Sequence, residues 1–206
     1  PSTGPTPLKK MDLMARVAKH FEDSANTKLN AVDQMAAPIA AAIETMTSCL
    51  INGGKILACG NGGSAGDAQH FAAELICRFE AERQELAAIA LTTDSSILTA
   101  VGNDYGFNHV FSRQVRGLGH AGDVLLAIST SGNSGNIIEA IKAAHEHDMR
   151  VIALTGKGGG QIGEMLGDDD IHLCVPADRT ARIQETHLLV IHCLCDGIDA
   201  LLLGVE

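Results

Sequence analysis

The sequence has no tryptophan, and aromatic residues make up only 3% of it. A buried core must therefore be built from Ala, Leu, Ile and Val, which suits helices packed closely on a sheet. Basic residues are also outnumbered, and the formal net charge is −10. A general nucleic-acid binder needs a basic surface to neutralise phosphates, so we expect no direct nucleic-acid partner.

Long hydrophobic runs are missing as well. The longest, such as 124–128 and 188–195, fall far below the roughly 20 residues that span a bilayer. No basic, apolar and cleavage-site pattern opens the chain, so we expect a cytoplasmic protein without a membrane partner. The six cysteines form no CxxC pair, and each is expected to act as a reduced, small hydrophobe.

What the sequence does contain is an alternation of short apolar runs and amphipathic segments. Runs that are apolar at nearly every position are typical of strands buried on both faces. The expected strands are 55–60, 86–91, 123–129, 150–156 and 170–175, and the expected helices are 64–80, 95–117, 134–148, 158–167 and about 179–203. Such alternation forms parallel βαβ units. We therefore expect an α/β fold, a flavodoxin-like three-layer α-β-α sandwich with a five-stranded parallel sheet.

The segment before the first strand has a helical pattern. Apolar residues recur at helical spacing over about 11–53, with a break around Asn26–Asn30 and a glycine pair at 53–54, so we expect an antiparallel helical pair. Residues 1–10 hold three prolines and are expected to be a disordered tail or a cloning remnant. Residues 11–206 then form a single domain, because this length suits one core.

Two loops of unusual composition follow strands whose carboxyl ends meet at one edge of the sheet, where ligands of such folds bind. The loop at 129–136 reads STSGNSGN. Hydroxyls at a helix start, together with its N–H groups and dipole, suit an anion. A turn with a single capping residue needs fewer hydroxyls. We therefore interpret Ser129, Thr130, Ser131 and Ser134 as phosphate contacts.

The other loop, GNGGSAG at 60–66, is less specific. It is neither the GxGxxG motif of dinucleotide sites nor a Walker loop, because no GK[ST] follows. Gly62 and Gly63 would let the backbone approach a ligand closely. Asn61 and Ser64 would add polar contacts.

The helix that leaves this glycine loop carries Asp67, His70 and Glu74 on one face, because residues three and four apart are neighbours on a helix. Three titratable groups on a helix that starts at a phosphate loop are unexpected, because the helix should otherwise bury an apolar face, and they favour a role in chemistry. An exposed His–Glu pair is, however, also a common ion pair of little energetic value.

The last helix shows a similar pattern. The polar residues Gln184, Glu185, His187 and His192 interrupt a sequence that is otherwise strongly apolar, and buried polar groups need partners. Gln184 and His192 are two turns apart, about 12 Å along the axis, and both could reach one ion between them. Spacing alone does not choose between His187 and His192.

Four segments together resemble the SIS (sugar isomerase) domain, which binds phosphosugars, and within it the phosphoheptose isomerases. They are CGNGGSAGDAQHFAAEL from 59, VGNDYGFNHVFSRQV from 101, GDVLLAISTSGNS from 122 and RIQETHLLVIH from 182. The resemblance covers nearly the whole chain from about Met11. It implies isomerisation of sedoheptulose 7-phosphate to D-glycero-D-manno-heptose 7-phosphate through an enediolate, the first step of ADP-heptose synthesis for lipopolysaccharide.

The resemblance also implies a ligand set and catalytic roles. One zinc ion per subunit would be held by His70, Glu74, Gln184 and His192, an N/O set that suits zinc. Glu74 would act as the base and His192 as the acid. A zinc-bound carboxylate is a weaker base, and whether Glu74 fills both roles at once stays open.

Further positions of this chain match sugar and phosphate contacts of the family. They are Asn61, Gly62, Gly63, Ser64, Glu74, Asn103, Asp104, Ser129, Thr130, Ser131, Ser134 and Gln184. Some members carry an acid three residues before the glutamine, where this chain has Ala181, which leaves one sugar contact without a counterpart. Arg78, one turn beyond Glu74, could add positive charge or simply lie on a solvated face.

A different function is the alternative. Several stretches, among them AAIALTTD and CLCDGIDALL, resemble the DnaA initiator-associating protein, a non-catalytic tetrameric adaptor of the same fold with a possible DnaA contact. That protein lacks the helix glutamate and the final histidine, whereas this chain keeps both as Glu74 and His192. The isomerase interpretation is therefore favoured. Both families form homotetramers, and the apolar surface of the terminal helices leads us to expect one here.

Overall fold

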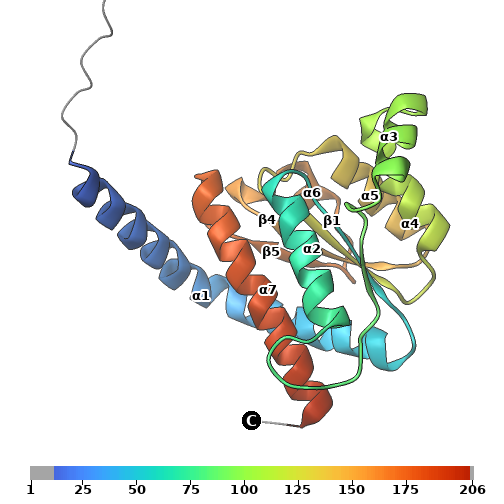
Figure 1. The fold of residues 1–206 in the computed structure, drawn as a ribbon, viewed down its shortest axis with the longest axis horizontal. Helices are drawn as coiled ribbons and strands as arrows, with labels where there is room; N and C mark the ends of the chain where they lie inside the picture. The colour runs from blue at the N-terminus through green and yellow to red at the C-terminus, as the bar shows by residue number, and fades with distance from the viewer. Residues whose placement is uncertain (1–11, 205–206) are drawn as a thin grey trace, which may run out of the picture.

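The computed structural model describes residues 12–204 as one three-layer unit (Figure 1). The tail expected at residues 1–10 lies outside the described residues. The strands are β1 Ile56–Cys59, β2 Ala88–Ala90, β3 Val124–Ser129, β4 Arg150–Thr155 and β5 Ile171–Cys174. The helices are α1 Leu13–Ile51, α2 Gly63–Ile76, α3 Ser95–Asp104, α4 Ser112–Leu118, α5 Gly135–Glu146, α6 Gly160–Met165 and α7 Thr180–Leu203, with short 3-10 turns at Phe107–His109 and Lys157–Gly159.

The five strands form one parallel sheet in the order β2-β1-β3-β4-β5. This confirms the predicted five-stranded α/β sandwich. Successive strand residues pack into different cores, as the two-residue period of a strand requires. Ile56 and Ala58 lie in the core shared with α1, α2 and α7, whereas Leu57 and Cys59 lie in the core shared with α3, α4, α5 and α6.

The predicted N-terminal helical pair is wrong, because α1 is one helix of 39 residues. The expected break at Asn26–Asn30 contains no glycine or proline, and an asparagine costs a helix well under about 1 kcal/mol. Thr27 Oγ1 even donates to the Asp23 carbonyl at 2.8 Å, within the helix. The helix also continues through Pro38. Its N-terminal turns extend beyond the sandwich, while its C-terminal part packs against α7 and the sheet (Figure 1).

The predicted helix 95–117 is interrupted. It forms α3, a 3-10 turn and α4 instead, because Gly106 adopts φ +88°, a conformation that a helix cannot contain. The other elements differ from expectation mainly at their ends. The expectation that every cysteine acts as a small hydrophobe is wrong for one of them. Cys49, Cys59 and Cys195 are buried, but Cys77 at the end of α2 is exposed.

By length and composition alone, α1 and α7 could each cross a bilayer, with mean hydropathy of 1.2 and 1.6 in their most apolar windows. Core helices meet the same criterion. Much of this apolar surface has a partner in the fold, since α7 packs against both α1 and α2 and supplies the buried Ile183, Ile191 and Leu194. The apolar composition of α7 therefore follows from its place in the core.

Candidate functional site

The two predicted phosphate loops lie side by side at the carboxyl edge of the sheet. Asn61 after β1 and Asn136 in the first turn of α5 exchange two amide hydrogen bonds, both 2.8 Å long. Asn136 is buried and was missed as a site residue, although it ends the STSGNSGN segment. The reciprocal amide pair fixes the glycine loop against the serine loop.

In the serine loop, the hydroxyls do not serve as ordinary helix caps. Ser134 is the N-cap of α5 but makes no side-chain bond to the helix backbone. Its Oγ lies 2.9 Å from Oγ of the buried Ser129. Ser131 Oγ accepts from the Asn133 amide at 3.2 Å, and the half-buried Thr130 lies between these serines in the chain. The hydroxyls thus gather in front of the α5 N-terminus, where the helix dipole favours an anion.

The glycine loop brings the end of β1 directly onto the N-terminus of α2. Gly62 is the N-cap with φ +55°, and Ser64 in the first turn is buried. A Cβ on Gly63 would come within 2.5 Å of Gln184 Nε2. The absence of that side chain therefore lets the Gln184 amide of α7 lie against the first turn of α2.

Further along α2, three predicted ligands converge. His70 Nε2 lies 2.8 Å from Glu74 Oε1 and 3.4 Å from His192 Nε2 of α7. One donor atom from each of the three side chains falls within 4.8 Å of the others, and all three residues are half-buried. This is a possible metal-binding group, built from two helices that lie side by side (Figure 1).

The spacing of the two imidazoles also fits a small cation. Two nitrogens bound to one tetrahedral zinc ion at about 2.1 Å each lie about 3.4 Å apart, which is the distance between the two Nε2 atoms. The chemistry of the donors, imidazole nitrogen and carboxylate oxygen, is that of zinc and similar metals. The residues therefore fit a metal ion of this kind.

Asp67 lies one turn before His70 on the same helix. Burial raises the pKa of its carboxyl to about 6, an effect that nearby His70 opposes. Within residues 12–204, its buried Oδ2 has no hydrogen-bond partner. Asp67 is thus a desolvated acid next to the metal-binding group rather than a solvated surface charge.

His187, the competitor of His192, has a structural role. It is fully buried, and its Nε2 lies 2.9 Å from the Thr155 carbonyl oxygen of β4. Burial lowers the pKa of His187 from 6.5 to about 4. His187 thus points into the core as a neutral donor, and it is His192 that meets His70.

The low pKa of His187 predicts an acid-sensitive fold. The folded state binds a proton at His187 less readily than the unfolded chain, so stability is fully present above pH 6.5 and is lost as the pH falls toward 4. The loss of stability from this residue approaches about 3 kcal/mol.

His187→Gln keeps a donor for Thr155 but cannot titrate. In urea unfolding of the metal-free protein, we expect it to lose less stability than the parent between pH 7 and pH 4.5, with the exposed His120→Gln as the control. An equal loss in both would contradict the prediction.

Three other residues considered from the sequence are Asn103, Asp104 and Arg78. Within residues 12–204, none of them forms a hydrogen bond to His70 or His192. Asn103 donates to Asp104 Oδ1 at 2.7 Å, and both are exposed in the last turn of α3. Arg78 is exposed and forms an i,i+4 pair with Glu82 at 3.7 Å, which fits the solvated-face interpretation.

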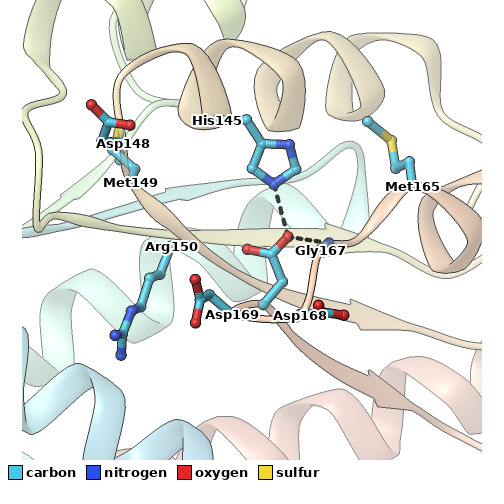
Figure 2. Close-up of a pocket in the computed structure, with 9 residues that line it drawn as sticks. His145, Asp148, Met149, Arg150, Met165, Gly167, Asp168 and Asp169 are labelled. Carbon is cyan, nitrogen blue, oxygen red and sulfur yellow. Dashed lines mark hydrogen bonds and ion pairs between the residues drawn. The ribbon is translucent and has the colours of Figure 1, made fainter.

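A cavity of about 420 Å³ lies at the opposite edge of the sheet, where β4 and β5 begin (Figure 2). His145 reaches into it and lies 2.8 Å from Asp170 Oδ2. Asp170 also accepts from the amides of Gly167 and Val151 at 2.8 and 2.9 Å. Its oxygens therefore already have partners that join α5, β4 and β5, and we assign this pair to structure.

Comparison with known proteins identifies the family. Residues 20–156 match the profile of the SIS domain, so the chain belongs to the SIS domain family. The phosphoheptose isomerase of Dechloromonas aromatica (strain RCB) is 91% identical over 196 residues, which is 95% of this chain and 100% of that relative. The phosphoheptose isomerase of Azoarcus sp. (strain BH72) is 73% identical over 95% of this chain and 100% of that relative. Within the SIS domain family, the chain therefore belongs to the phosphoheptose isomerases.

Solved structures agree. The phosphoheptose isomerase from Neisseria gonorrhoeae matches with 62% identity and a TM-score of 0.88 over 92% of this chain and 100% of that one. The enzyme from Francisella tularensis matches with 50% identity and a TM-score of 0.89 over 92% and 99%. These relatives carry the isomerase name, so the adaptor alternative is not favoured.

Proposed function

We propose that this protein is an enzyme that interconverts sedoheptulose 7-phosphate and D-glycero-D-manno-heptose 7-phosphate in the cytoplasm, the first step of ADP-heptose synthesis for lipopolysaccharide. The observation that carries the proposal is the convergence within 4.8 Å of His70 and Glu74, on the helix that starts at the glycine loop, with His192 of α7. The isomerase names of its relatives support it.

The distance between the two parts of the site suits a heptose. Ser64 and His70 are six residues apart on α2, or about 9 Å along its axis. This is roughly the length of an extended seven-carbon chain. We therefore expect that a substrate whose terminal phosphate lies in the loops would have its carbonyl end near Glu74 and His192.

We assign the phosphate to the hydroxyl-rich loops and the sugar to the polar groups around them. Ser64, Ser129, Thr130, Ser131 and Ser134 would contact the phosphate, and Asn61, Gly62, Gly63, Glu74, Asn103, Asp104 and Gln184 would contact the sugar. Two helix N-termini, those of α2 and α5, then face the anion. For Asn103 and Asp104, the assignment rests on the family resemblance alone.

The chemistry follows from two side chains. Isomerisation removes a proton from the carbon next to a carbonyl and returns it to the neighbouring carbon. Glu74 would accept this proton as a carboxylate and return it as the carboxylic acid so formed, and His192 would supply a proton to the substrate oxygen. Zinc, held by His70, Glu74, Gln184 and His192, would polarise the substrate oxygens and stabilise the negative charge that develops.

The test is to incubate the zinc-supplied protein with sedoheptulose 7-phosphate and follow aldose formation by NMR. Turnover is expected. No turnover in a folded, zinc-loaded sample would overturn the proposed function and revive the adaptor alternative, for which a pull-down with DnaA is the direct measurement.

We also propose that the protein assembles as a homotetramer through α1 and α7. Phe21, Leu29 and Val32 of α1 are 75%, 71% and 55% exposed. An apolar groove of about 310 Å³ runs between the two helices and is lined by Val32, Ile39 and Leu189, among others. Surfaces of this kind mark protein–protein contacts.

Val32→Glu is expected to shift the molar mass in light scattering below that of the tetramer, because a charge buried without a partner destabilises an interface. Gln34→Glu is the matched control. It adds the same charge about 200° further around α1, outside the groove. A parent protein that is monomeric at micromolar concentration would contradict the assembly itself.

A further inference from the structure

Arg83, in the loop between α2 and β2, closes the end of the helix that carries Glu74. Its Nη2 donates to the Glu74 carbonyl oxygen and its Nη1 to the Leu75 carbonyl oxygen, both at 2.8 Å. These carbonyls belong to the last turn of α2, where a helix has no internal donors left. The guanidinium also places a positive charge at the negative end of the helix dipole.

The same guanidinium binds α7. Arg83 Nε donates to Asp199 Oδ1 at 2.7 Å, and the two side chains are only 3% and 7% exposed. The other carboxylate oxygen of Asp199 is buried and has no partner within residues 12–204. Arg83 is thus the one cation paired with this buried charge in the described chain.

Asp199 and His192 lie on the same side of α7. Seven residues span almost two full turns, or about 10.5 Å along the axis. Arg83 therefore connects the backbone of Glu74 itself to the helix face that presents His192. Figure 1 shows α2 and α7 side by side, with the connecting segment after α2 passing across the C-terminal part of α7.

We propose that Arg83 and Asp199 are positioning residues that set the distance between the two halves of the His70–Glu74–His192 group. The inference rests on the proposed function insofar as this group holds the metal. His70 and Glu74 are on α2 and His192 is on α7, so the 3.4 Å spacing between the two histidines depends on how the helices are joined. Partners behind the ligands of a metal site typically change metal affinity by about 10- to 100-fold when they are replaced.

The test uses Asp199→Asn and Arg83→Lys, each titrated with Zn²⁺ alone in the absence of substrate. Asparagine keeps an acceptor but loses the charge. Lysine keeps the charge but cannot donate to Asp199 and both carbonyls in the same planar arrangement. Both variants are expected to bind Zn²⁺ about 10- to 100-fold more weakly. Bound Co²⁺ should give an altered visible spectrum.

Asp123→Asn separates positioning from general stability. It breaks another buried ion pair, Lys55–Asp123, with side chains 22% and 3% exposed, where β3 begins. Its unfolding midpoint should fall, while its Zn²⁺ affinity and Co²⁺ spectrum stay those of the parent. Unchanged Zn²⁺ affinity and Co²⁺ spectra in folded Asp199→Asn and Arg83→Lys would overturn the proposal.

The metal titration does not depend on turnover. A parent protein that binds Zn²⁺ but fails to isomerise sedoheptulose 7-phosphate would refute the proposed function and leave the positioning role intact. A parent protein that binds no Zn²⁺ would refute the positioning role.

Discussion

Glu74→Gln is expected to lower kcat by about 10² to 10⁴-fold, the usual contribution of a positioned base. Glutamine has nearly the same volume as glutamate and keeps a polar group beside His70 Nε2, which lies 2.8 Å from Glu74 Oε1. It cannot take up a proton from carbon. The fold should be unaffected, because the substitution leaves the backbone carbonyl of residue 74, which accepts from Arg83, unchanged.

The same variant addresses the question that spacing and resemblance leave open, namely whether Glu74 is both ligand and base. An amide oxygen is a weaker ligand than a carboxylate, so zinc content and kcat are measured together. We expect kcat to collapse in samples to which zinc has been restored to one ion per subunit.

Glu82→Gln is the control for this loss of charge, because its side chain is 89% exposed and outside the metal-binding group. It should keep parental kcat. A fully zinc-loaded Glu74→Gln that retains more than a tenth of parental kcat would show that another group removes the proton.

The parts of the molecule that sequence predicts well are those governed by local chemistry. Apolar runs gave the five parallel strands because a strand buried on both faces has little room for polar residues. The order of strands and helices then fixed the edge at which the loops meet. His70 and Glu74 were paired correctly because an i,i+4 spacing on a helix has one geometry.

Features that depend on contacts between distant segments were not predictable in this way. The Asn61–Asn136 pair joins residues 75 apart, and the Arg83–Asp199 pair joins residues 116 apart. The local sequence marks the loops that contain Asn61 and Asn136 but not the bond between them, and nothing near Arg83 or Asp199 distinguishes these two from ordinary loop or surface residues. The prediction of an N-terminal helical pair was wrong for a related reason. Two asparagines resemble a helix break in the local sequence, but α1 gains its stability from packing on α7 and the sheet.

Gly132→Ala is expected to lower kcat/KM by about 10²-fold, the scale of a misplacement of about 1 Å at a binding site. Gly132 follows the three hydroxyl residues of the serine loop and adopts φ +66°. A Cβ there would come within 1.8 Å of the Gly159 carbonyl oxygen. That oxygen is backbone, so the loop after β4 or the serine loop must move.

The variant should also be less stable by at least about 2 kcal/mol, since a left-handed residue other than glycine costs about 1–2 kcal/mol before any clash is counted. Gly53→Ala provides the matched control. Gly53 has φ +80°, and nothing lies within 4 Å of its would-be Cβ, so it carries the backbone strain without the collision. It should lose about 1 kcal/mol of stability and none of its kcat/KM. Because both variants bear the same backbone strain, the difference between them in kcat/KM isolates the displacement of the serine loop. If Gly132→Ala matched Gly53→Ala in kcat/KM, the serine loop would not be the phosphate site.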